Sequence, residues 1–219
     1  MVRELQPGII INDRLQIDQD IKTPEQYMPR EWLKVSGKPV IWEACHTFSG
    51  SWGYHRDEES WKSVEMLVKM LIDTVSKGGN LLLNVGPTGR GEFDERALER
   101  LEGIGRWMKR HSRSIYGCTQ APDEFKCPPD CRYTYNPETN RLYLHVFSWP
   151  YKHIHLDDMA ERVEYAQFLN DASEVRMIFH KPDAQEHFIA RGDESTLTLE
   201  IPVKKPDAEV PVIELFLKS

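Results

Sequence analysis

The sequence lacks an uninterrupted apolar run of about 18 residues, the length that a membrane-spanning helix needs, and no signal peptide opens it. It also lacks any stripe of basic residues, because its 219 residues carry 28 Lys and Arg against 35 Asp and Glu, for a net charge of −7. Nucleic acid is bound through clustered cations that neutralise its phosphates. We therefore expect neither a nucleic acid nor a membrane as a partner.

Cysteine is scarce, and its spacing does not suit zinc. The four residues are Cys45, Cys118, Cys127 and Cys131, and they contain no CxxC pair. We expect no metal site, because structural zinc sites use closely paired ligands. A loop disulfide or packing thiols is the better interpretation. So few cysteines leave the compartment open, and we prefer the cytoplasm to secretion.

The first half of the chain alternates strand-like and helix-like segments. Continuous apolar runs at residues 8–11, 39–42 and 80–85 are typical of strands that are buried on both faces. Apolar residues recur every three or four positions across residues 60–77 and 94–111, which predicts two helices. This order of strands and helices indicates an α/β arrangement, in which crossover helices connect parallel strands.

The second half shows strand-like patterns alone. Residues 132–135 and 141–147 alternate with period two on either side of a turn at 136–140, which predicts a hairpin. Short strands at regular intervals are typical of an all-β sandwich. The further strand candidates are residues 153–156, 163–169, 175–180, 195–201 and 212–217.

The charge distribution separates the same two halves. Through Tyr116, 17 Lys and Arg balance 17 Asp and Glu, whereas the remaining residues have 11 against 18. We therefore expect an α/β domain over residues 1–116 and an all-β domain over residues 117–219. The N-terminal residues run directly into the apolar segment 8–11 without a lead-in, so we also expect a truncated N-terminus.

Polar residues follow each predicted strand of the first half. Residues 12–14 (Asn-Asp-Arg) follow the first run, Glu43 the second and Asn84 the third. The carboxyl ends of parallel strands carry the active site in α/β barrels, so these side chains suit a small polar ligand. His46 is a further candidate ligand, although a histidine that only makes a structural hydrogen bond is commoner. Any one of these residues could also simply cap a strand.

Aromatic and acidic residues near these strand ends indicate a sugar as the ligand. Trp42 and Trp52 flank a polar stretch, and an aromatic face is a large apolar surface that suits the C–H face of a sugar ring. Glycosidases need two carboxyl groups beside the scissile bond, and Glu25 and Glu43 are the candidates. Arg14 is placed to hold a neighbouring carboxylate in its ionised form.

Several of these residues occur within longer motifs, in a fixed order along the chain. The motifs are Thr23-Pro24-Glu25-Gln26, Trp42-Glu43, Ser51-Trp52-Gly53-Tyr54 and Val75-Ser76-Lys77-Gly78-Gly79-Asn80-Leu81-Leu82-Leu83-Asn84-Val85-Gly86-Pro87. This set resembles the retaining α-L-fucosidases of glycoside hydrolase family 29. The last motif is the most specific, whereas the first alone would be weak.

The resemblance implies the C-terminal portion of a (β/α)₈-like barrel, followed by a β-sandwich. It implies a retaining exo-glycosidase that releases terminal α-L-fucose from glycans and needs no cofactor. The family's aspartate nucleophile lies on a strand before the position matched by Asn12, so the missing N-terminal barrel half is an expected partner. Arg14 matches a family arginine near the nucleophile, and Trp52 matches an aromatic wall of the fucose pocket. The oligomeric state stays open.

The resemblance leaves two candidates for the general acid/base. In some family members this residue matches Glu25, and in others it matches Glu43. We favour Glu25, because it lies in a longer loop that can approach a glycosidic oxygen. Glu43 directly follows the apolar run 39–42, so a fixed hydrogen-bonding role suits it equally well.

A function of a different class is also compatible with the sequence. A chain that derives from such an enzyme and has lost its nucleophile would be a non-catalytic carbohydrate-binding or interaction protein. Genomic DNA upstream of Met1 distinguishes the two hypotheses, because an open frame that encodes the first half of a barrel favours the enzyme.

We predict that the 219-residue chain alone does not hydrolyse an aryl α-L-fucoside. Without the nucleophile that the resemblance places further upstream, no covalent glycosyl intermediate can form. Release of the aryl group by the purified chain, followed by absorbance, checks this. Robust turnover would show that the nucleophile is present within these residues.

Overall fold

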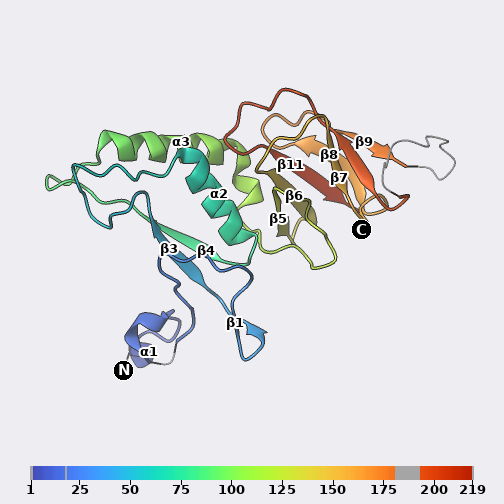
Figure 1. The fold of residues 1–219 in the computed structure, drawn as a ribbon. Coiled ribbons are helices and arrows are strands. Elements are labelled where there is room, and N and C mark those ends of the chain that lie inside the picture. Colours follow the sequence, from blue (N-terminus) through green and yellow to red (C-terminus); the bar gives the residue numbers. More distant parts are fainter. Residues whose placement is uncertain (1, 18, 181–192, 219) are drawn as a thin grey trace.

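The computed structural model describes residues 2–17, 19–180 and 193–218 (Figure 1). Its helical elements are α1 (Val2–Leu5), η1 (Asp13–Leu15), α2 (Val64–Val75), α3 (Glu95–His111) and η2 (Ser112–Ser114), of which η1 and η2 are 3-10 turns. Its strands are β1 (Lys34–Val35), β2 (Lys38–Pro39), β3 (Glu43–Thr47), β4 (Asn80–Asn84), β5 (Cys131–Asn136), β6 (Arg141–Val146), β7 (His153–Leu156), β8 (Val163–Phe168), β9 (Arg176–Phe179), β10 (Leu197–Glu200) and β11 (Val212–Leu217). No described helix is long and apolar enough to cross a membrane.

The predicted strand–helix–strand unit is present in the first half. β3 and β4 pair in parallel, with Cys45 opposite Leu82, and α2 connects them. The α2 helix begins after Ser63, whose side chain accepts a hydrogen bond from the amide of Met66. The α3 helix begins after Asp94, which caps it in the same way through the amide of Arg96. These caps explain why α2 is shorter than the predicted helix 60–77, whereas α3 nearly matches 94–111.

Two predicted strands of the first half are wrong. Residues 8–11 form no strand, and the run 39–42 precedes the strand that begins at Glu43. The segment around Lys22 and Glu25 instead runs beside β3, through isolated parallel bridges of Lys22 with Trp42 and of Glu25 with Cys45, and Asn12 forms a further parallel bridge with Ile21. Residues 8–11 and 39–42 are apolar, but they lack the run of consecutive backbone pairs that would make them parallel strands beside β3.

The second half consists of two antiparallel sheets, with strand orders β5-β6-β11-β8 and β7-β10-β9. Both sheets contribute to one hydrophobic cluster, because alternate side chains of each strand point toward the other sheet. The predicted hairpin is present, and the Asn136 side chain accepts hydrogen bonds from the amides of Glu138 and Thr139 in its turn. The buried residues at the centre of the cluster include Leu142, Leu144, Leu156, Leu197, Leu199, Ile213 and Leu215.

A second cluster joins the two halves. Val68 and Ile72 of α2 and Trp107 of α3 share it with Tyr143 of β6 and Val212 of β11. The indole N–H of Trp107 donates to the carbonyl of Val210 at 2.8 Å. In Figure 1, α2 lies between the β3–β4 pair and the C-terminal sheets, and α3 runs above it with one end near those sheets, while the segment around α1 extends away from them.

The remaining face of the β3–β4 layer is open. Several large apolar side chains are exposed on this face and on the segments beside it. The surface of a monomeric protein rarely exposes a large apolar patch. The side chains in question are Ile10 (69% exposed), Leu15 (63%), Ile41 (60%) and Leu82 (52%).

The contact between α2 and α3 gives a prediction with a matched control on one helix. A Cβ atom at Gly103 would lie 2.5 Å from Val64 Cγ2, whereas a Cβ at Gly105 would meet nothing within 4 Å. We expect Gly103→Ala to destabilise the protein by about 1–3 kcal/mol through overpacking. Gly105→Ala should stabilise it by about 0.5–1 kcal/mol through helix propensity. Urea unfolding measures both, and equal effects would contradict the described α2–α3 packing.

Candidate functional site

A cavity of about 410 Å³ lies where the segments around Arg14 and Glu25 meet one face of β3 and β4 and the loop that follows β3. It contains four of the six side chains that the sequence singled out, namely Arg14, Glu25, Glu43 and Trp52. The full lining consists of Asn12, Arg14, Thr23, Glu25, Glu43, Cys45, Trp52 and Leu82. Charged, aromatic and aliphatic groups therefore converge on one space.

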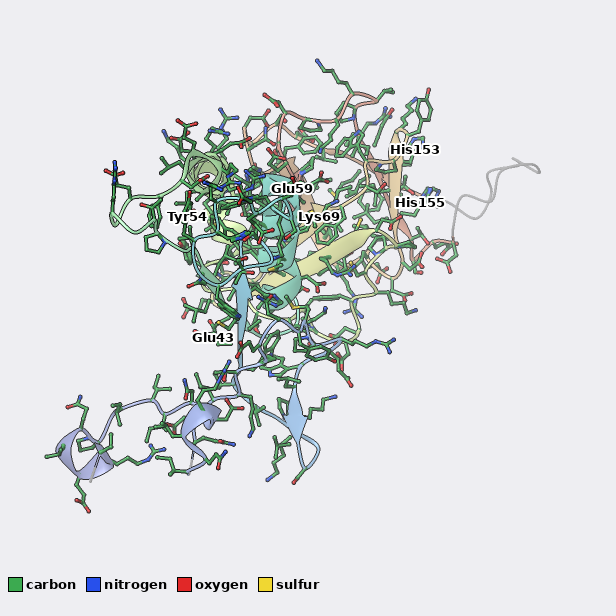
Figure 2. All side chains as sticks on the ribbon, turned by 60° about the vertical axis from the view of Figure 1, so that its left-hand side comes forward. Glu43, Tyr54, Glu59, Lys69, His153 and His155 are labelled. Atoms are coloured by element: carbon green, nitrogen blue, oxygen red, sulfur yellow. The ribbon has the colours of Figure 1, made fainter. Side chains whose placement is uncertain are left out.

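The alternation of β3 decides which of its side chains reach the cavity. Glu43 and Cys45 both line it, and they are two residues apart on one face of the strand. The intervening Ala44 is fully buried. Figure 2 shows Glu43 on this strand, well separated from the C-terminal histidines His153 and His155.

Trp42 is not part of the cavity, which corrects its predicted role as a sugar wall. The residue is fully buried, and its indole N–H donates to the Lys77 carbonyl at 3.2 Å. Its ring packs so closely on Gly79 that a Cβ there would lie 2.3 Å from the ring. Trp42 therefore belongs to the core beneath β3 and explains the glycine at position 79.

His46, the further candidate ligand of the sequence analysis, likewise does not line the cavity. It is 5% exposed, and it lies on the face of β3 opposite to Cys45. Burial, and then the charge of Lys62, lower the pKa of its ring. Its Nε2 atom has no hydrogen-bond partner among the described residues.

Arg14 is held at the cavity wall by several contacts. The η1 turn begins after Asn12, whose side chain accepts a hydrogen bond from the Arg14 amide. The Arg14 Nε donates to Thr23 Oγ1 at 2.8 Å, and an Nη1 hydrogen bond joins the guanidinium to the Glu25 carboxylate as an ion pair. The bond to Glu25 raises the pKa of Arg14. Burial opposes ionisation of the neighbouring Asp13, but hydrogen bonds from Thr23 outweigh it and lower its pKa.

The two glutamates have different surroundings in the same cavity. Glu25 is paired with Arg14, whereas the Glu43 carboxylate has no hydrogen bond or ion pair within the part of the chain that the structure describes. The Glu43 amide donates to the Lys22 carbonyl at 2.9 Å, which fixes the backbone of Glu43 beside the extended segment. One carboxylate is therefore balanced by a cation and the other is not.

Trp52 reaches the cavity from the loop between β3 and α2. The side-chain amide of Asn84, the last residue of β4, donates to the Trp52 carbonyl at 2.6 Å. A Cβ at Gly86 would lie 2.5 Å from the Gly53 carbonyl carbon, so the absence of a side chain there lets the two loops touch. The Trp52 side chain is 41% exposed, which leaves part of its surface available to a ligand.

Sequence reasoning did not single out Thr23, Cys45 or Leu82 as lining residues. Cys45 follows from Glu43 by the period of two along a strand, and Leu82 is opposite Cys45 in the parallel register. Both could have been inferred only once the strand limits and register were known. The described residues contain no group of three or more potential metal ligands, and all four cysteines are free thiols.

Comparison with known proteins gives one consistent result. The family model described as "Alpha-L-fucosidase" matches residues 1–113. The plasma alpha-L-fucosidase of Rattus norvegicus is 40% identical over 116 residues, which are 51% of this chain and 25% of that protein. The alpha-L-fucosidase of Dictyostelium discoideum is 34% identical over 111 residues, with 50% and 24% covered.

Solved structures extend the likeness over the second half. Alpha-L-fucosidase isoenzyme 1 from Paenibacillus thiaminolyticus matches 100% of this chain and 52% of its own, with a TM-score of 0.88 and 35% identity. The alpha-L-fucosidase from Vibrio sp. strain EJY3 matches with a TM-score of 0.82 and 28% identity, over 100% of this chain and 37% of its own. The chain thus spans about a quarter of the curated relatives and about half of the first solved structure, and it corresponds to their C-terminal part.

Cys45 offers a probe of the cavity that the chain itself supplies. Burial raises the pKa of the Cys45 thiol, while the charge of Arg14 acts in the opposite direction. We predict that Arg14→Gln raises this pKa further and slows alkylation of Cys45 near pH 8 by up to about tenfold, the factor for one pKa unit. Mass spectrometry of alkylated peptides, measured across a pH series, follows each cysteine separately.

The other three cysteines are internal controls for this measurement. Arg56→Gln is the matched variant, because Arg56 is exposed and paired with Asp57 outside the cavity. A pH–rate profile of Cys45 that is the same in Arg14→Gln as in the parent would show that the guanidinium does not act on this thiol.

Proposed function

The chain belongs to the α-L-fucosidase family, and from this membership we propose that it forms the C-terminal part of a retaining enzyme that releases terminal α-L-fucose from glycans. The cavity carries this proposal, because it brings two carboxyl groups, a guanidinium and an indole together. Retaining glycosidases need a nucleophile and an acid/base. The resemblance places the nucleophile before Asn12, so residues 1–219 supply the acid/base and part of the sugar-binding wall.

We assign the acid/base role to Glu43, and this reverses the preference drawn from the sequence. A general acid/base must face the glycosidic oxygen and exchange a proton with it, and a carboxylate that is already held in an ion pair with a guanidinium is less free to do so. Glu25 has such a contact with Arg14. Glu43 has none among the described residues, and it shares the cavity with Cys45 and Leu82.

The reaction then divides into two steps. In the first step, Glu43 donates its proton to the glycosidic oxygen as the nucleophile attacks the anomeric carbon and the aglycone leaves. In the second step, the Glu43 carboxylate takes a proton from water as the water oxygen attacks the same carbon, and the bond from that carbon to the nucleophile breaks and releases fucose. Arg14 and Glu25 remain paired and bind sugar hydroxyls, and Trp52 packs on the C–H face of the ring.

The proposed architecture follows from membership of the same family. We propose that residues 1–116 form the C-terminal portion of a (β/α)₈-like barrel and that residues 117–219 form a β-sandwich. The parallel segments joined through β3 and β4 support the barrel, and the shared cluster of the two antiparallel sheets supports the sandwich. The open apolar face with Ile10 and Leu82 would be covered by the preceding half of the barrel.

The natural substrate in this proposal is a fucosylated glycan. We also retain a cytoplasmic location as a proposal, and the four free thiols are consistent with a reducing compartment. The oligomeric state stays open.

Matched glutamine variants test the acid/base assignment in the gene product that also contains the preceding residues. We expect Glu43→Gln to slow substrates with poor leaving groups by about 10²–10⁴-fold, the usual range for general acid catalysis. Activated aryl fucosides need less protonation of the leaving group, so their first step should suffer less. Azide should restore turnover of this variant and yield an α-fucosyl azide, which NMR identifies.

Glu25→Gln is the control. It should weaken substrate binding through the loss of the Arg14 pair, without rescue by azide. If azide instead rescues Glu25→Gln and not Glu43→Gln, the sequence-based assignment is right and ours is wrong. Binding of L-fucose without any turnover in the longer protein would support the non-catalytic alternative.

A further inference from the structure

The loop that carries Trp52 is closed at its base by one carboxylate. We propose that Glu58 is a positioning residue for the sugar, because it fixes the loop of residues 50–60 and thereby sets where the Trp52 indole stands in the cavity. The inference rests on the proposed function only in naming Trp52 as a sugar wall. The fixing of the loop is a property of the described contacts themselves.

The Glu58 side chain joins the two ends of this loop. Its Oε2 accepts from the Ser51 hydroxyl at 2.6 Å, one residue before Trp52. Its Oε1 accepts from the Ser60 amide at 2.8 Å and from the Ser60 hydroxyl at 2.6 Å. The same Ser60 hydroxyl accepts from the Gly50 amide at 3.0 Å. Ser51 is therefore tied to Ser60 through the Glu58 carboxylate, and Gly50 is tied to Ser60 directly.

The backbone of Glu58 is in turn fixed to α3. Its carbonyl accepts from Arg96 Nη1 at 2.8 Å and from the Trp61 indole N–H at 3.1 Å. The guanidinium groups of Arg96 and Arg100 lie 5.0 and 5.2 Å from the Trp61 ring. Arg96 also pairs with Asp94, the N-cap of α3. Glu58 thus connects the loop of residues 50–60 to the N-terminal end of α3.

The Trp52 indole depends on this backbone for its placement. Among the described residues, Trp52 has no aromatic stacking contact, no cation–π contact and no indole hydrogen bond, and its side chain is 41% exposed. Its anchors are the Asn84 bond to its carbonyl on one side and the Ser51–Glu58 bond on the other. A shift of either anchor would move the ring relative to Arg14 and Glu43.

The Glu58 carboxylate keeps its charge at all but strongly acidic pH. Hydrogen bonds from Ser51 and Ser60 lower the pKa of Glu58 from 4.5 to about 2. Because the folded value is depressed, the stabilisation is fully present above pH 4.5 and is lost only as the pH falls toward 2. Glu58 is therefore a permanent anchor and not a switch.

Fluorine NMR of the 219-residue chain tests the clamp without any need for activity. The tryptophans are labelled as 5-fluorotryptophan, and the Trp52 resonance is assigned by its loss in Trp52→Phe. We expect Glu58→Ala to shift and broaden this resonance, and Glu58→Gln, which retains one acceptor oxygen, to give a smaller change. Glu59→Ala is the matched control, because the adjacent Glu59 is exposed and has no hydrogen bond or ion pair among the described residues. Figure 2 marks Glu59 on the same loop.

Kinetics in the longer gene product then test the role in sugar positioning. We expect Glu58→Ala to lower kcat/KM for an aryl α-L-fucoside by about 10–100-fold, since misplacement of about 1 Å can cost this much. Glu58→Gln should recover part of the loss, and Glu59→Ala should match the parent.

Each outcome decides one part of the inference. An unchanged Trp52 resonance in Glu58→Ala, or an equal change in Glu59→Ala, overturns the clamp. A changed resonance with an unaffected kcat/KM overturns the positioning role. If the parent protein hydrolyses no fucoside, the proposed function fails, and the NMR result still decides whether Glu58 fixes the loop.

Discussion

The parallel pairing of β3 with its two neighbours is the constraint on which the cavity depends. The extended chain around Lys22 and Glu25 lies on one side of β3, and β4 lies on the other. A strand presents successive side chains to opposite faces, so this pairing sends Glu43 and Cys45 into the cavity and leaves Ala44 and His46 buried. A slip of one residue would exchange these two sets. The register across β3 thus matters more for the chemistry than the composition of any one motif.

Electrostatic asymmetry is the second feature of the site. Two carboxylates in one cavity can take different roles when their surroundings differ. Arg14, fixed by Thr23 and by the η1 turn, is next to Glu25 and not next to Glu43 in the described contacts. The same guanidinium acts on the Cys45 thiol. The cavity therefore contains one carboxylate, Glu25, whose charge is balanced by Arg14, and a second, Glu43, that has no such partner among the described residues.

Sequence patterns predicted elements whose signals are local. The α3 helix, β4, β7 and β11 were anticipated closely, because capping, helical periodicity and alternation are properties of neighbouring residues. Residues 8–11 and 39–42 failed as strands because an apolar run by itself fixes neither burial nor strand pairing, and Ile10 and Ile41 are exposed. Trp42 and His46 were misplaced in the site for a related reason, since the start of β3 at Glu43 determines which way each residue faces.

The ion pair of Arg14 with Glu25 forms only because the fold brings the two residues together. The sequence could suggest only that Arg14 would pair with a carboxylate, and not which one. The boundary at residue 116 and the roles of the two glutamates stay predictions.

The strand that comes latest in the sequence occupies an interior position in its sheet. β11 lies between β6 and β8, and the carbonyl of Val210, just before it, holds the Trp107 indole of α3. During synthesis, β5, β6 and β8 therefore emerge from the ribosome before the strand that joins β6 to β8. The edges of β6 and β8 that face β11 stay unpaired until residues 212–217 arrive, and unpaired edges invite association with other chains. The pairing of β11 with β6 and β8, and the hydrogen bond from Trp107 of α3 to Val210, therefore form late in folding and between residues far apart in the sequence.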